Sequence, residues 1–435
     1  MARWERAHWE SSVAAGVPRR DRRSGTYHRY LPDHLDGRPL AIDPPLSRRL
    51  AVAERAVRAL SGLGAESLAG VARFLLRSEA IASSRIEGVA PSPQQVALAE
   101  LGTQESVRGV SEQARLVANN MTVVRQATSD LVAVDEVTVA HVVDLHAALL
   151  PEDARRHGLR TVQNWIGGST WHPLDADFVP PPHEQVPELM NDLVAYLNGA
   201  VHSPIVHAAL VHAQFETIHP FTDGNGRVGR ALIHTVLTRR GLTPAAVLPV
   251  SLVLATLREA YVEGLARYRY HGEASSVSAT SGVRSWLATF TETAMIAAQQ
   301  SADLVTRVLA LEEDWRQRLA THRSARGVRE MPRAGSASAR LLAVLPEAPV
   351  VTARSAQRIL GVSFPAAASA LDELHAASVL DTRTVDRGAT AYVATEVLDL
   401  ITTTERRLAS TAFDTRVAAP RRAVPTPPHQ EQSPE

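Results

Sequence analysis

A glycine-rich loop between two expected helices restricts the fold of this chain more than any other segment. Residues 204–218 place apolar side chains at helical spacing, which predicts a helix that packs on a core. That helix is expected to end at His219, because Pro220 disfavours the helical conformation of the residue before it. A second helix is expected to begin at about Arg227, directly after the loop 223–226. The loop therefore joins the end of one helix to the start of another.

The loop has the chemistry of a phosphate-binding site. Its two glycines let backbone N–H groups turn inward as an anion nest, and the helix N-terminus behind them adds a positive dipole. Arg227 and Arg230 are three residues apart and project from the same side of the first turn. Asp223 fits beside an anion site when a cation bridges it to phosphate, and Mg²⁺ is the expected ion. Since His219 can accept a proton near neutral pH, the set predicts phosphoryl or nucleotidyl transfer.

Composition narrows the chemistry and the location of the protein. The 435 residues predict two or three domains. The chain contains no Cys, and its 46 basic residues are all Arg, so disulfides, thiolate nucleophiles, cysteine-ligated zinc and lysine-dependent mechanisms are excluded. The 46 acidic residues balance the basic ones, so net charge indicates no particular partner. No segment resembles a signal peptide or a membrane span, and we expect a cytoplasmic protein without a membrane partner.

Helical periodicity recurs along most of the chain and predicts a mainly α fold. Glycines divide the helical pattern of residues 46–86 into two helices, and the second stops at Gly88. The stretch 158–182 is irregular, and within it residues 169–171 and 177–179 are expected to form a short hairpin. The other expected helices are 109–128, 135–149, 184–198, 204–218, 251–266, 281–297 and 299–322.

Changes in pattern and composition divide the chain into six segments. They are an extended arm (1–45), a helical region (46–109), a core (110–298), a linker helix (299–335), a winged-helix domain (336–402) and a disordered tail (403–435). The tail is rich in Pro and polar residues, which predicts disorder.

The winged helix is inferred from the order of helix, turn, helix and hairpin. The expected helices are 352–360 and 365–377, and the strands 382–385 and 391–393 flank a turn at 386–388. This domain contains five Arg and seven acidic residues, and such an excess of negative charge is unfavourable for contacts with DNA phosphates. A protein target or a homodimer is therefore at least as well supported as DNA.

Residues 219–230, His-Pro-Phe-Thr-Asp-Gly-Asn-Gly-Arg-Val-Gly-Arg, match the signature of the Fic-domain family without a mismatch. Residues 163–169, 178–182 and 212–216 also resemble core segments of that family, and the likeness covers roughly residues 110–295. The resemblance implies an all-helical core with the signature in a loop between two helices. It also implies a β-hairpin flap that aligns the acceptor segment of a target protein by strand addition. The implied flap residues are Ser169, Thr170, Trp171, Phe178 and Val179.

The same resemblance implies protein adenylylation, in which AMP passes from ATP to a Ser, Thr or Tyr hydroxyl of a target protein or of the enzyme itself. His219 would be the general base, and Asp223 would hold Mg²⁺ against the α- and β-phosphates. The implied nucleotide-binding residues are Gly224, Asn225 and Gly226 in the anion nest and Arg227 and Arg230 on the outer phosphates. The alternative is a nucleotide-binding transcriptional regulator that acts through the winged helix.

The segment Ser83–Gly88 matches the inhibitory motif of the same family. Ser83 and Glu87 are four residues apart and share one helical face, and Gly88 suits a left-handed helix cap. By resemblance, Glu87 would pair with Arg230, occupy the space of the ATP γ-phosphate and keep activity low. Some relatives use this glutamate to remove AMP from a modified target, so the net direction of the reaction stays open.

Overall fold

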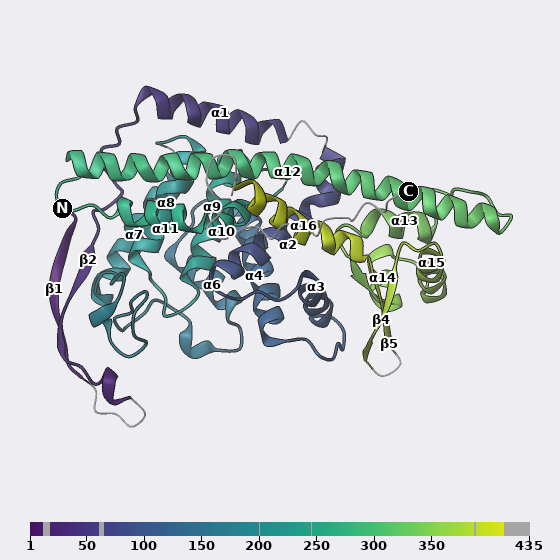
Figure 1. Cartoon of the computed structure of the whole chain (residues 1–435), viewed down its shortest axis with the longest axis horizontal. Helices are drawn as coiled ribbons and strands as arrows, with labels where there is room; N and C mark the ends of the chain where they lie inside the picture. The colour runs from purple at the N-terminus through teal and green to yellow at the C-terminus, as the bar shows by residue number, and fades with distance from the viewer. Residues whose placement is uncertain (12–17, 61–64, 200, 245, 387–388, 413–435) are drawn as a thin grey trace, which may run out of the picture.

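The computed structural model describes residues 1–11, 18–60, 65–199, 201–244, 246–386 and 389–412. Helices dominate these residues and strands are few, which confirms the expected mainly α fold. A helical bundle lies beneath one very long helix, and a smaller unit of helices and strands lies near the far end of that helix (Figure 1). None of the described helices combines the length and the apolar composition that a membrane span requires.

The long helix, α12 (Val277–Ala325), covers both the bundle and the smaller unit (Figure 1). Its 49 residues correspond to a length of about 70 Å. The sequence predicted two helices here, with a domain boundary at residue 298, and the structure shows one continuous helix instead. After Gly282 the helix contains neither Gly nor Pro, and Ala297 and Ala298 lie buried on its inner face, so no local signal interrupts it.

The bundle surrounds two central helices, α8 (Pro204–Ile218) and α9 (Asn225–Arg239). Every residue of α8 is buried, and α9 is buried from its first residue to Leu237. The two helices pack against each other, and their neighbours close over both of them. The neighbouring helices are α12 together with α1 (Pro44–Leu60), α2 (Ala65–Ile86), α4 (Glu112–Thr128), α5 (Asp130–Ala133), α6 (Val139–Leu149), α7 (Val186–Asn198) and α11 (Arg258–Tyr268). Helix α10 (Val250–Thr256) packs against α2 and α12 instead.

Two details of the bundle differ from the sequence-based expectation. The helix expected at 251–266 is divided at Leu257 into α10 and α11. Helix α3 (Pro93–Gly102) was not predicted, although Ser92 and Gln95 form the capping box that typically marks a helix start. Short 3₁₀ turns occur at Arg19–Asp21, Ala154–Arg156, Pro173–Asp175 and His183–Gln185.

The N-terminal segment is a hairpin rather than the extended arm that the sequence predicted. Strand β1 (Arg3–Trp9) pairs antiparallel with β2 (Gly25–Leu31) and protrudes at one side of the bundle (Figure 1). The amide of Tyr30 donates to the carbonyl of Val179 across 2.9 Å, which ties this hairpin to the irregular segment of the core. The pairing joins residues some twenty positions apart, so local spacing did not indicate it.

The irregular segment 158–182 does not contain the expected hairpin between 169–171 and 177–179. Instead, Phe178 forms an isolated antiparallel bridge with Ile166. Gly167 and Gly168 have left-handed backbones and turn the chain directly after Ile166. The antiparallel pairing of Ile166 with Phe178 therefore does not continue beyond Ile166. A side chain at Gly168 would overlap the carbonyl oxygen of Asp175, which explains why the turn requires glycine.

The smaller unit contains three helices and a three-stranded sheet with the strand order β3-β5-β4. Its elements are α13 (Ala337–Val344), β3 (Val350–Val351), α14 (Ala353–Leu360), α15 (Phe364–Ala376), β4 (Asp381–Asp386) and β5 (Ala389–Val393). The last two residues of the expected turn, 387 and 388, lie outside the described residues. Helices and strands therefore occur in the order expected for residues 352–393.

Helix α16 (Thr395–Ala412) corrects the expected start of a disordered tail at residue 403. Val397, Ile401 and Leu408 are buried along one face of this helix, which explains why it continues past residue 402. It returns towards the bundle and packs against α3, α10 and α12 (Figure 1). The tail residues 413–435 lie outside the described residues.

Candidate active site

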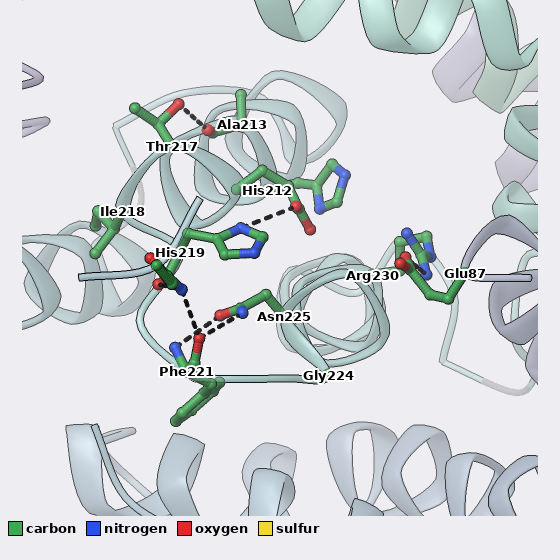
Figure 2. Close-up of polar contacts among 12 residues, drawn as sticks. Glu87, His212, Ala213, Thr217, Ile218, His219, Phe221, Gly224, Asn225 and Arg230 are labelled. Atoms are coloured by element: carbon green, nitrogen blue, oxygen red, sulfur yellow. Dashed lines mark hydrogen bonds and ion pairs between the residues drawn. The ribbon is translucent and has the colours of Figure 1, made fainter. Parts of the chain in front are cut away.

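The glycine-rich loop begins where the sequence predicted, whereas the helix after it begins two residues before the expected start at Arg227. Helix α8 ends at Ile218, and His219 caps it with a left-handed backbone (φ 50°, ψ 60°). Gly224 is also left-handed (φ 80°), and α9 begins at Asn225. The Asn225 side chain closes the loop, because its Oδ1 accepts from the amide of Phe221 and its Nδ2 donates to the carbonyl of Phe221, both across 2.8 Å (Figure 2). The Asn225 side chain thus fixes the shape of the loop from within.

Three further side chains support the loop from outside, and sequence reasoning assigned none of them to it. Nε2 of His146 lies 2.9 Å from the carbonyl oxygen of Asp223, and the His146 ring stacks on Phe221 at 3.9 Å. Arg160 donates from Nε to the carbonyl of His219 across 2.9 Å. Asn164 donates to the carbonyl of Phe221, also across 2.9 Å. Asn164 fell within a segment that resembles the family, but its backbone target could not be read from sequence.

The first turn of α9 offers several unpaired donors. Among the residues that the structure describes, no acceptor pairs with the amides of Asn225, Gly226 or Arg227. Nε and Nη1 of Arg227 are buried and likewise have no hydrogen-bond partner in the described chain. Buried donors without acceptors are costly, so this arrangement fits a site that receives an anion. The side chain of Asn225 is used by the loop, which leaves its backbone amide for the anion.

The carboxylate of Glu87 occupies part of this anion site. Oε1 of Glu87 accepts from Nη2 of Arg230 across 2.8 Å, and a side chain at Gly226 would overlap the same oxygen. Arg230 also donates to Oγ of Ser83 across 2.9 Å and to the carbonyl of Ser83 across 2.8 Å. Figure 2 shows Glu87 and Arg230 side by side at α9. The structure therefore brings Arg230 to Ser83 and Glu87, which lie 147 and 143 positions before it in the sequence.

The electrostatics of Glu87 follow from this pairing. Burial alone raises the pKa of the Glu87 carboxyl, but the charge of Arg230 and its hydrogen bond outweigh burial and hold the pKa below its ordinary value. Glu87 is therefore ionised at neutral pH. A carboxylate at a helix N-terminus beside an arginine resembles a phosphate oxygen in charge and in hydrogen-bonding capacity.

Asp223 lies at the edge of the same loop. Its Oδ2 is 3.1 Å from Nη1 of Arg156, its Oδ1 is 3.4 Å from Nη2 of Arg227, and Oδ1 accepts from the amide of Gly224 across 2.6 Å. The described residues contain no cluster of three acidic, His or Cys side chains that would hold a metal ion by themselves. A single half-exposed carboxylate beside an anion nest fits Mg²⁺ that is shared with phosphate oxygens, and it does not fit a site made of protein ligands alone.

His219 is mostly buried at the other end of the loop. Burial and the charges of Arg269 and Arg160 together lower the pKa of His219 to about 4, while Glu87 and the backbone carbonyl of Glu216 oppose the shift. The imidazole is therefore neutral at pH 7 and able to accept a proton. Its Nδ1 lies 3.9 Å from Oε2 of Glu216 on α8.

The residues assigned to the flap separate into two groups. Thr170 and Trp171 are exposed, and Ser169 is partly exposed and donates to Oδ1 of Asp21 across 3.1 Å. Phe178 and Val179 are buried, and the guanidinium of Arg269 lies 3.5 Å from the centre of the Phe178 ring. Only the first group is available to another chain.

Residues 136–237, which include α8, the loop and nearly all of α9, match the family described as Fic/DOC. The chain carries a Fic domain. Glu87 and α2 lie outside the matched residues.

Curated relatives are similar over the Fic domain. The chain is 34% identical over 123 residues to the protein adenylyltransferase fic-1 of Caenorhabditis elegans, which covers 27% of this chain and 22% of that protein. It is 32% identical over 120 residues to the protein adenylyltransferase Fic of Nematostella vectensis, which covers 26% of each chain. The chain thus spans only 22–26% of the length of these relatives. A solved Fic family protein from Desulfovibrio desulfuricans aligns with 82% of this chain and 97% of its own, with 21% identity and a TM-score of 0.48.

A buried polar cluster fixes α2 to the Fic domain. Glu79 is fully buried, and its Oε1 lies 2.9 Å from Nε2 of His234 on α9. Its Oε2 accepts from the amide of Ser251 across 2.8 Å, and its Oε1 accepts from the Ser251 hydroxyl. His234 is one turn beyond Arg230, so Glu79 sets the register of α2 along α9 two turns before Glu87.

Two arginines connect α2 with segments beyond the Fic domain. Buried Arg77 pairs with Glu100 of α3 across 2.7 Å and donates to the carbonyl of Glu347 in the smaller unit across 2.9 Å. Arg85, two residues before Glu87, pairs with Glu405 of α16. Helix α2, which ends one residue before Glu87, is therefore held by contacts with α3, with the smaller unit and with α16.

Proposed function

We propose that this protein is an autoinhibited protein adenylyltransferase, which transfers AMP from ATP to a hydroxyl group of a target protein or of itself. The observation that carries the proposal is the position of the Glu87 carboxylate against Gly226 and Arg230. An anion at this place lies at the start of α9, on the same loop as His219. The curated relatives named above are protein adenylyltransferases, and they support the same reaction class.

The loop supplies each function that the reaction needs. Neutral His219 accepts the proton of the acceptor hydroxyl as its oxygen bonds to the α-phosphorus, and the bond to the bridging oxygen of the β-phosphate breaks. Pyrophosphate then leaves. The unpaired amides of Asn225, Gly226 and Arg227 and the side chain of Arg227 would stabilise the phosphates. Asp223 would hold Mg²⁺, which supplies positive charge for the phosphate oxygens.

Autoinhibition follows from competition for one position. Glu87 places a negative charge where an outer phosphate of ATP would contact Arg230 and Gly226. Two anions cannot share this site without strong repulsion, so ATP is displaced or misaligned while Glu87 stays in place. Withdrawal of Glu87 would leave Arg230 held by Ser83 and free to bind phosphate.

The acceptor segment of the target is proposed to dock along residues 169–171. Thr170 and Trp171 are exposed at this edge, whereas Phe178 and Val179 are buried and contribute only by supporting it. We propose that the smaller unit is a winged helix that recognises a protein partner. The residues of α15 include no Arg, and its acidic pair Asp372 and Glu373 is unfavourable for DNA.

The function is tested by measuring which phosphate of ATP becomes attached to protein. Wild type, Glu87→Gly and His219→Ala are incubated with Mg²⁺ and either α-labelled or γ-labelled ATP, and protein-bound label is measured. We expect Glu87→Gly to retain label only from the α position, wild type to retain much less, and His219→Ala none. Glu273→Gly, in an exposed loop, is the matched control and should behave as wild type. Retention of only the γ label would instead identify a kinase.

A further inference from the structure

Glu216 is a buried carboxyl group that the proposed mechanism leaves without a role. It lies in the last turn of α8, three residues before His219, and its Oε2 is 3.9 Å from Nδ1 of that histidine. Nδ1 of His219 and Oε1 of Glu216 are both buried, and neither has a hydrogen-bond partner among the described residues. Unpaired buried polar groups are costly, and the other oxygen of this carboxyl group, Oε2, is the one that lies 3.9 Å from Nδ1, so the proximity of the two groups calls for an explanation.

Gly229 makes the space that the Glu216 carboxylate occupies. A Cβ atom at this position would lie 2.7 Å from Oε1 of Glu216 and 2.8 Å from Cδ1 of Phe215. Both contacts are to α8, so this glycine serves the close approach of α8 and α9, unlike Gly226, which faces the anion site. The last glycine of the loop motif is thus explained by Glu216.

The charges around Glu216 favour a role in which its carboxylate stabilises a positive charge on His219. Burial raises the pKa of Glu216 to about 7, while Arg230 and Arg269 favour its charged form and Glu87 opposes it. A positive charge that forms on His219 would add a third favourable neighbour. The titratable and charged groups that face Glu216 are Glu87, His212, His219, Arg230, Tyr261 and Arg269.

We propose that Glu216 is the positioning residue of His219: its carboxylate faces Nδ1–H, directs Nε2 towards the acceptor hydroxyl, and stabilises the imidazolium that forms during AMP transfer. This inference rests on the proposed function. The hydroxyl proton moves to Nε2 as the oxygen–phosphorus bond forms and pyrophosphate leaves, and Glu216 itself neither gains nor loses a proton. The arrangement resembles the histidine–carboxylate pair of serine hydrolases in its logic.

The first experiment measures His219 directly and needs no AMP transfer. In the Glu87→Gly protein with isotope-labelled histidine, the His219 ring signals are assigned by their loss in His219→Ala, and their titration is followed by NMR. We expect the Nδ1–H tautomer, and we expect Glu216→Gln to lower the pKa of His219 and to change the tautomer. An identical tautomer and pKa in the two proteins would overturn the proposal.

The second experiment separates catalysis from binding. In the Glu87→Gly background, Glu216→Gln should lower kcat for AMP transfer roughly 10- to 100-fold and change KM for ATP less than about twofold. Glu263→Gln, whose side chain is exposed and pairs with Arg267 across 2.6 Å, is the matched control. The acid limb of the kcat profile should move to lower pH. A kcat that stays within twofold of the parent protein would also overturn the proposal.

A further variant covers the case in which Glu216→Gln does not fold. Gly229→Ala retains the carboxylate but displaces it, so it should reduce kcat and alter the His219 titration in the same way. If Glu87→Gly transfers no AMP at all, the proposed function fails, and the NMR comparison alone decides the role of Glu216. A fall in kcat without any change in the His219 titration would show that Glu216 acts through packing and would reject the proposal.

Discussion

Arg85 on α2 and Glu405 on α16 form an ion pair, with Nη1 and Oε2 2.5 Å apart. Glu405 is mostly buried, and Arg85 is only two residues from Glu87. The C-terminal helix therefore holds the end of the helix that places a carboxylate in the anion site. A partner that moves α16 would act on Glu87 through this contact.

Loss of that ion pair should weaken the inhibition. Glu405→Gln removes the charge but retains the shape, so the end of α2 becomes less constrained and Glu87 leaves Arg230 more often. We expect AMP transfer by the full chain to rise several-fold, and to remain below that of Glu87→Gly. Initial rates with α-labelled ATP measure the change, and Asp399→Asn, exposed on the same helix, is the control. Unchanged rates would indicate that α2 is held without α16.

Removal of the Glu87 side chain should lower the stability of the protein and increase its affinity for ATP. Glu87→Gly leaves buried Arg230 without its carboxylate, and we expect a loss of about 1–2 kcal/mol, since the Glu87 side chain is 37% exposed and partly screened. ATP with Mg²⁺ should then raise the melting temperature of the variant more than that of wild type, because a ligand that binds the folded state more tightly stabilises it more. Thermal unfolding with and without nucleotide measures both effects. Equal shifts would show that Glu87 and ATP do not compete.

Asp223 should control the requirement for Mg²⁺. In the Glu87→Gly background, Asp223→Asn removes the only charge that the loop offers to a cation, and we expect the Mg²⁺ concentration for half-maximal rate to rise about tenfold. Asp153→Asn is a control close in space, because Asp153 pairs with Arg156, which also contacts Asp223. If Asp223→Asn lowers the rate equally at all Mg²⁺ concentrations, the carboxylate has another role.

The buried cluster around Glu79 should contribute strongly to stability. Glu79→Ala removes the partner of Ser251 and His234, both fully buried, and leaves their polar atoms without it. We expect a loss of about 3–5 kcal/mol in the free energy of unfolding, measured with urea. Glu112→Ala, exposed in the first turn of α4, should change it by less than about 1 kcal/mol. A small effect at Glu79 would mean that packing alone sets the register of α2.

The raised pKa of Glu216 predicts how stability depends on pH. The folded state binds its proton more tightly than the unfolded state, so the contribution is complete below the ordinary pKa of Glu and is lost as pH rises through about 7. Relative to Glu216→Gln, wild type should lose up to about 3 kcal/mol between pH 5 and pH 8. His219 titrates in both proteins and largely cancels in the comparison. Denaturant unfolding at several pH values measures the difference, and parallel curves would contradict it.

Local rules predicted the centre of the site because local conformation creates it. Pro220 ends α8, Gly224 adopts the left-handed turn, and α9 begins one residue later, and each of these features follows from a residue within the loop. The pairing of Glu87 with Arg230 was predicted as well, but only through the resemblance of the motif around Glu87 to a known family. Spacing along the chain does not indicate which distant arginine a carboxylate meets.

The amino-acid sequence by itself determined the helical class, the loop at 219–230 and the chemistry of its side chains, since each depends on neighbours within a few positions. Only the tertiary structure showed that β1 pairs with β2, that α12 passes residue 298 without a break, and that α16 returns to hold Arg85. It also showed that Gly229 of α9 leaves the space that the Glu216 carboxyl group occupies. Such contacts depend on burial and on the close approach of whole helices, and no short stretch of sequence specifies either.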